Sequence, residues 1–127
     1  MNSFIAIALG GAIGAVGRYG FVQSLTRYAG VGFPYGTMGV NIIGSICMGM
    51  IVGLSLHHVP MSENLKLFLV VGVLGGFTTF SAFSLDTINL IESGEVTTAI
   101  IYVSASVILS ILGLWLGITL TRIGIPT

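Results

Sequence analysis

The chain has 127 residues, of which 54% are hydrophobic and only 6% are charged, and its mean hydropathy is +1.07. A soluble domain of this size could not bury so much apolar surface, so the composition predicts a membrane protein. Four basic and four acidic residues give a formal net charge of zero, which excludes the basic surface typical of nucleic-acid-binding proteins.

Four apolar segments have the length of roughly 20 residues that a helix needs to cross a bilayer. We expect these spans at about residues 4–25, 36–56, 65–91 and 98–120, in a single integral membrane domain that covers residues 1–127. The predicted fold class is therefore an all-α membrane protein with four transmembrane helices. An even number of spans places both ends of the chain on the same side of the membrane.

Each span contains a pair of glycines four residues apart. The pairs are Gly10/Gly14, Gly49/Gly53, Gly72/Gly76 and Gly113/Gly117. Small residues at this spacing let the backbones of neighbouring membrane helices approach closely. We therefore expect a tightly packed helix bundle.

The first span also carries Arg18, a basic residue well inside the apolar segment. One interpretation is that its long side chain reaches back to the membrane interface. The other is that its charge attracts anions into a water-filled vestibule.

Polar residues recur every four positions in the second and fourth spans. They are Thr37, Asn41 and Ser45 in the second span, and Tyr102, Ser106 and Ser110 in the fourth. Residues at this spacing share one helix face. Such rows are compatible with hydrogen bonds between helices, or with a polar track for an ion that has lost its water. For Asn41 a functional role is favoured, because burying an amide in mid-span without hydrogen-bond partners costs free energy.

The third span is too long for one straight helix. About 27 residues would reach roughly 40 Å, which exceeds the hydrocarbon core. Its centre reads Gly-Gly-Phe-Thr-Thr-Phe-Ser-Ala-Phe-Ser over residues 75–84. Glycines weaken a helix, and Thr78, Thr79 and Ser81 can bond freed backbone groups. We predict a break near residues 75–81, which is tolerated at membrane depth only inside protein or beside an aqueous cavity.

Three phenylalanines of the third span, Phe77, Phe80 and Phe83, recur at a spacing of three. An aromatic row at helical spacing ordinarily packs in a core. Beside a break, the positive ring edges could instead face an anion without binding it too tightly to leave.

The basic residues give almost no preference for one orientation in the membrane. Lys66 and Arg122 lie on one predicted side, and Arg18 and Arg27 lie on the other. A Lys/Arg excess in cytoplasmic loops normally sets the orientation. The balance is compatible with chance, or with an antiparallel dimer built from chains in both orientations.

The absence of certain residue types restricts the possible functions. The first, second and fourth spans have no acidic residue near their middle, whereas a small proton-coupled exporter needs a carboxylate within the membrane. Enzyme motifs are absent as well, so we expect no enzyme. Passive ion conduction is favoured. A small coupled multidrug or cation exporter and a structural membrane subunit without transport remain as alternatives.

The chain resembles the Fluc/CrcB family of fluoride ion channels over nearly its whole length. The resemblance rests on residues 10–19, 36–44 and 72–83, and the Gly-Phe-Thr-Thr-Phe-Ser-x-Phe core of the last segment is highly specific. Ala82 stands where many relatives have threonine or serine, which affects one minor polar contact.

The resemblance implies a dual-topology homodimer with two antiparallel pores in the cell membrane, which is the inner membrane in a Gram-negative bacterium. The dimer would export fluoride passively from the cytoplasm and so reduce its toxicity. A structural sodium ion, not transported, would lie at the dimer interface on the backbone carbonyls of Gly75 and Thr78. Arg18 would line the vestibule. The fluoride pore would include Thr37, Asn41, Phe80, Ser81, Phe83, Tyr102, Ser106 and Ser110.

Overall fold

The computed structural model describes residues 2–123, and the chain is all-helical over this range. The elements are α1 (Ser3–Ala29), α2 (Tyr35–His57), α3 (Glu63–Lys66), η1 (Leu67–Leu74), α4 (Gly75–Phe77), α5 (Phe80–Glu92) and α6 (Val96–Ile123).

Four helical stretches are long and apolar enough to cross a membrane. They are Ser3–Ala29, Tyr35–His57, Glu63–Glu92 and Val96–Arg122, and each contains one of the predicted spans. The chain is therefore a multi-pass membrane protein, as its composition predicted. The third stretch is made of α3, η1, α4 and α5 in succession.

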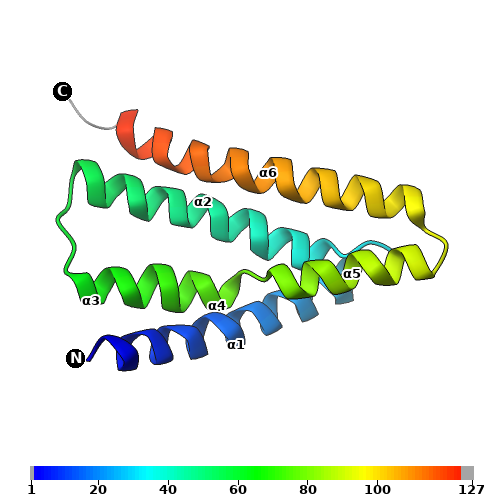
Figure 1. Cartoon of the computed structure of the whole chain (residues 1–127), viewed down its shortest axis with the longest axis horizontal. Helices are drawn as coiled ribbons and strands as arrows, with labels where there is room; N and C mark the ends of the chain where they lie inside the picture. Colours follow the sequence, from blue (N-terminus) through cyan, green and yellow to red (C-terminus); the bar gives the residue numbers. More distant parts are fainter. Residues whose placement is uncertain (1, 124–127) are drawn as a thin grey trace.

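The helices pack as two pairs. Figure 1 shows α2 and α6 side by side, with the succession from α3 to α5 on the other side of α2. Helix α1 packs against η1 and α4 of that succession. The beginning of α1 and the end of α6 lie at the same end of the bundle.

The paired glycines lie where helices touch, so this prediction is confirmed. A Cβ atom on Gly10 would lie 3.0 Å from Cα of Gly72, where α1 crosses η1. Where α2 packs on α6, a Cβ atom on Gly49 would overlap the backbone carbonyl of Leu114. A Cβ atom on Gly117 would overlap that of Ile46. Close backbone approach of this kind is the main way in which membrane helices associate without a hydrophobic driving force between them.

We expect Gly14→Ala to destabilise the folded protein by about 1–3 kcal/mol, the usual effect of adding a carbon to a filled site. The added Cβ would overlap the carbonyl oxygen of Val73 and lie 2.8 Å from the backbone nitrogen of Phe77. Gly20→Ala is the matched control, since its Cβ would meet no described atom from another helix within 4 Å. Thermal unfolding in detergent measures both variants. Equal losses would contradict the packing argument.

The third stretch leaves helical geometry at Thr78 and Thr79. Thr78 has φ −85° and ψ 158°, and Thr79 has φ −153° and ψ 119°, so both are extended. Gly75 and Gly76, which were expected to weaken the helix, themselves stay helical. Gly76 has a different role: a Cβ there would lie 2.7 Å from the carbonyl oxygen of Gly11, so its small size lets α1 approach.

The turns of η1 are π-helical, which the sequence pattern did not indicate. In such turns each N–H bonds to the carbonyl five residues earlier instead of four, so they are wider than α-helical turns. η1 leads directly into α4 and the extended residues.

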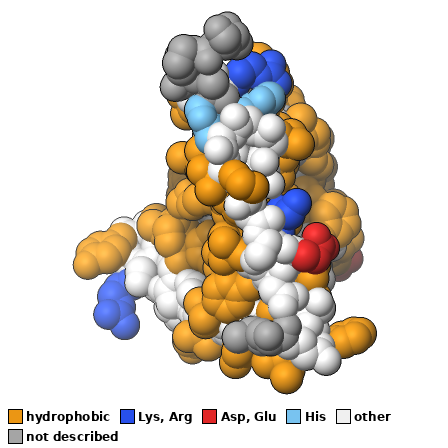
Figure 2. All heavy atoms as spheres, turned by 90° about the vertical axis from the view of Figure 1, so that its left-hand side faces the viewer, with side chains coloured by type: hydrophobic (Ala, Val, Ile, Leu, Met, Phe, Trp, Pro, Cys, Tyr) orange, Lys and Arg blue, Asp and Glu red, His pale blue; other side chains and the backbone are white. Residues whose placement is uncertain are grey.

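Apolar side chains cover most of the surface. Figure 2 shows few charged side chains among the hydrophobic ones at the end where α1 begins. Large apolar residues of two helices are well exposed, for example Val16 on α1 and Trp115 on α6, at 72% and 62%. Such a surface is suited to lipid or to another protein chain, and not to water.

Candidate functional site

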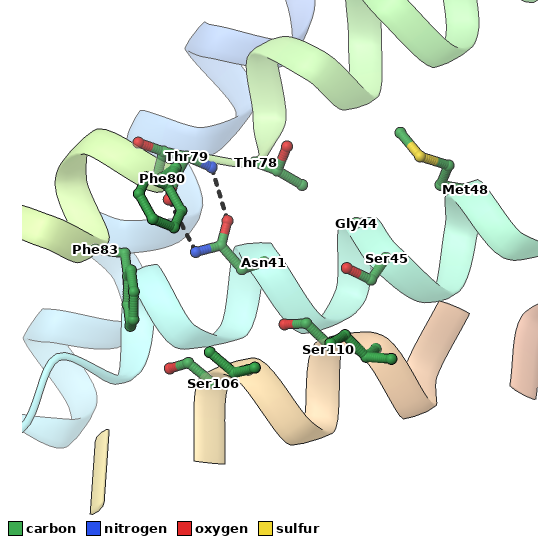
Figure 3. A pocket seen from close by; sticks show the side chains of 12 residues that line it. Asn41, Gly44, Ser45, Met48, Thr78, Thr79, Phe80, Phe83, Ser106 and Ser110 are labelled. Atoms are coloured by element: carbon green, nitrogen blue, oxygen red, sulfur yellow. Dashed lines mark hydrogen bonds between the residues drawn. The ribbon is translucent and has the colours of Figure 1, made fainter. Parts of the chain in front are cut away.

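A pocket of about 390 Å³ opens between α2, α6 and the beginning of α5. Figure 3 shows side chains from all three helices around it. The lining residues are Asn41, Gly44, Ser45, Met48, Thr78, Thr79, Phe80, Phe83, Ser106, Val107, Ser110 and Ile111. None of these described residues is charged, so the pocket offers a small ligand only hydroxyl, amide, backbone and aromatic groups.

Asn41 binds the backbone of the break from α2. Its Nδ2 donates to the carbonyl oxygen of Thr79 at 2.9 Å, and its Oδ1 accepts from the N–H of Thr79 at 2.7 Å. Both bonds are drawn in Figure 3. Both polar atoms of this mid-span amide therefore have hydrogen-bond partners, and these belong to the backbone of the third stretch.

The two threonines of the break satisfy further backbone groups locally, as their sequence position predicted. Oγ1 of Thr78 donates to the carbonyl of Leu74 at 2.9 Å. The hydroxyl of Thr79 accepts from the N–H of Ala82 at 3.0 Å, which makes Thr79 the N-cap of α5. An N-cap of this type stabilises a helix by roughly 1 kcal/mol.

Ser106 has the one buried side-chain oxygen or nitrogen of the described residues that lacks a hydrogen-bond partner. The residue is 4% exposed and lines the pocket from α6, together with Ser110. A buried hydroxyl without a partner is unusual, because it loses its water without compensation. Such a group is suited to a small acceptor that occupies the pocket.

The three phenylalanines have two different environments. Phe80 and Phe83 line the pocket, with ring centroids 5.6 Å apart. Phe77 instead packs edge to face on Phe21 of α1, at 6.1 Å. Core packing, the ordinary interpretation of the row, therefore applies to Phe77 but not to Phe80, which is 78% exposed.

The other predicted pore residues lie beside this pocket and do not line it. Tyr102 is fully buried, and its hydroxyl donates to Oδ2 of Asp86 at 3.0 Å. Its ring centroid lies 5.2 Å from that of Phe83. Thr37 is buried, and Ser81 is exposed with its hydroxyl 3.4 Å from that of Thr79.

Arg18 contacts the break from the opposite side. Its Nε donates to the carbonyl oxygen of Gly76 at 3.1 Å. Within the described residues, no hydrogen bond reaches the carbonyl oxygens of Gly75 or Thr78. In a continuous helix they would accept from the N–H groups of Thr79 and Ala82, but these bond instead to Asn41 and to the Thr79 hydroxyl. Two backbone oxygens of the break are thus free to bind something else.

Seven lining residues were outside the predicted pore set: Gly44, Ser45, Met48, Thr78, Thr79, Val107 and Ile111. Ser45 lies four residues after Asn41 and continues the polar row of α2, so the spacing alone could have included it. Met48 gives no such signal, because an isolated methionine in an apolar span ordinarily packs in the core. No group of His, Cys, Asp and Glu that could hold a metal occurs among residues 2–123.

The chain is similar to proteins described as fluoride channels. A family model described as "CrcB-like protein, Camphor Resistance (CrcB)" matches residues 5–118. A "Fluoride-specific ion channel FluC" of Rhodospirillum centenum is 47% identical over 122 residues, which cover 96% of this chain and 97% of the relative. Proteins of the same name from Geobacter sulfurreducens and Paracoccus denitrificans are 45% and 47% identical, over 96% and 95% of this chain and 98% and 95% of their own lengths.

Proposed function

Because this chain belongs to the CrcB family, we propose that it is a fluoride-specific ion channel that exports fluoride passively across the cell membrane. The relatives are named as fluoride-specific ion channels. The alternative of a coupled exporter is not favoured, because the relatives are named as channels and the first, second and fourth spans have no acidic residue near their middle.

The observation that carries this proposal is the unpartnered hydroxyl of Ser106 in a pocket without charged side chains. Fluoride is a small, strong hydrogen-bond acceptor, so a row of hydroxyl donors can replace part of its water. The pocket also adjoins the N-terminus of α5, where free N–H groups and the helix dipole favour an anion.

The rings of Phe80 and Phe83 would contribute positive edges to the same path. Neutral donors and ring edges hold an anion less firmly than a lysine or arginine would. Conduction requires such weak binding, because an ion must leave a site as readily as it enters. In this proposal Tyr102, Thr37 and Ser81 extend the path beyond the pocket, and Arg18, on the other side of the break, adds positive potential in a vestibule.

We also propose that two chains assemble as an antiparallel, dual-topology homodimer with two pores, around the broken third helix. The balanced basic residues support insertion in both orientations. Gly75 and Phe80, on either side of the extended residues Thr78 and Thr79, are exposed in the single chain. Large apolar residues of α1 are exposed as well. A second copy would cover these groups.

A structural sodium ion fits the residues at the break. The carbonyl oxygens of Gly75 and Thr78 lack hydrogen bonds within the described part of the chain. Carbonyl oxygens suit a small, hard cation, and a two-fold axis would bring the same pair from the partner. When bound, the ion would supply positive charge that balances these carbonyl dipoles.

Fluoride efflux from liposomes that contain the purified protein tests the function. We expect fast efflux that requires a potassium ionophore, because a channel that moves an anion alone builds up charge. Chloride-loaded liposomes are the control and should retain their anion. Efflux that needs a proton gradient, or no efflux from correctly folded protein, would refute the proposal.

A further inference from the structure

We infer that Asn41 is a positioning residue that sets the orientation of the break through the backbone of Thr79. This inference rests on the proposed channel function, and it goes beyond the role of an amide that simply lines the pore. Its basis is that the two polar atoms of the Asn41 side chain both bond to one residue 38 positions away.

The geometry at Thr79 explains this pairing. With φ −153° and ψ 119°, Thr79 is extended, so its own N–H and C=O point to the same side. In an antiparallel sheet a residue of the neighbouring strand would bond to both groups. Here the side-chain amide of Asn41 replaces that strand, with distances of 2.7 Å and 2.9 Å. The N–H can only donate and the C=O can only accept, so the orientation of the amide is determined as well.

These two bonds also set the direction of the neighbouring groups, because each peptide unit is planar and trans. The N–H of Thr79 shares its plane with the carbonyl of Thr78, and the two groups point in opposite directions. By holding that N–H, Asn41 turns the Thr78 carbonyl away from itself. By holding the Thr79 carbonyl, it turns the N–H of Phe80 away in the same manner.

One side chain therefore links the pocket to the other face of the break. Asn41 lines the pocket, whereas the Thr78 carbonyl is one of the two free oxygens assigned above to sodium. Two of the four hydrogen-bonding positions of the amide are used on Thr79, which leaves one N–H and one lone pair for the pocket.

Hydrogen exchange of the Thr79 amide in the full chain tests this inference. In Asn41→Ala we expect the Thr79 amide to exchange at least about tenfold faster than in the wild type, since a net hydrogen bond of about 1.5 kcal/mol corresponds to roughly that factor. Ser45→Ala is the matched control, because Ser45 lines the same pocket from the same helix and has no bond to the break. Its Thr79 exchange should equal that of the wild type.

Asn41→Asp separates positioning from ion contact. Its carboxylate can still accept the Thr79 N–H, so protection should persist, while the added negative charge should lower fluoride efflux. If Asn41→Ala does not fold, Asn41→Ser removes the same two bonds, because its side chain is too short to reach Thr79. Unchanged Thr79 exchange in a folded Ala or Ser variant would overturn the inference. If the wild type conducts no fluoride but Asn41→Ala still loses Thr79 protection, the channel function is refuted and the positioning role of Asn41 stands.

Discussion

Replacing Phe83 by isoleucine should lower the rate of fluoride efflux by about tenfold, and Phe80→Ile should have a similar effect. Both rings line the pocket at a centroid separation of 5.6 Å. Isoleucine retains an apolar side chain but lacks the positive ring edge, whose specific interactions contribute roughly 0.5–1.5 kcal/mol. A loss of about 1.4 kcal/mol along the ion path corresponds to a factor of ten in rate. Efflux from liposomes, normalised to the amount of folded protein, measures the effect.

Phe77→Ile is the matched control, because Phe77 belongs to the same motif but packs on Phe21 away from the pocket. We expect it to lower thermal stability and to leave efflux per folded protein close to the wild-type value. If Phe80→Ile and Phe83→Ile both conduct normally, the two rings provide only packing.

Complete replacement of sodium by a large organic cation should dissociate the proposed dimer and stop fluoride efflux. A ligand that binds only the assembled state at 100 times its dissociation constant stabilises that state by about 2.7 kcal/mol, and this contribution is lost on its removal. The free carbonyl oxygens of Gly75 and Thr78 would then be left without a partner. Size-exclusion chromatography with light scattering, in sodium and in N-methylglucamine buffers, measures the fraction of dimer.

Thr78→Ala tests whether the carbonyl and not the hydroxyl binds the ion. The hydroxyl of Thr78 already donates to the carbonyl of Leu74, so its removal should leave the sodium dependence in place. A dimer fraction that is the same with and without sodium would show that the break holds no structural cation.

The break shows where inference from the sequence was sufficient and where it was not. The excess length of the third span and its polar centre predicted an interruption within residues 75–81, and the extended residues lie inside that range. Gly75 and Gly76 were expected to weaken the helix, because glycine is a poor helix former. Both remain helical, and the close approach of α1 explains instead why position 76 needs a small residue.

For the polar residues too, the sequence predicted one part of the arrangement and the structure decided another. Spacing placed Asn41 and Ser45 on one helix face and Ser106 and Ser110 on another, and all four line the pocket. Tyr102 has the same spacing as the two serines, yet its hydroxyl bonds to Asp86 outside that pocket. Periodicity identifies a face, but it does not say which element that face will meet.

By itself, the sequence determined the membrane environment, the four spans and the glycine contacts, since these follow from hydropathy, length and side-chain size along each helix. Only the tertiary structure decided the hydrogen-bond partners of the polar side chains. Asn41 bonds to Thr79 across 38 positions, and Arg18 bonds to Gly76 across 58. A hydrogen bond depends on distances of about 3 Å and on direction. Spacing along one helix cannot specify the distance and direction between groups on separate helices. The packing of those helices against one another sets both.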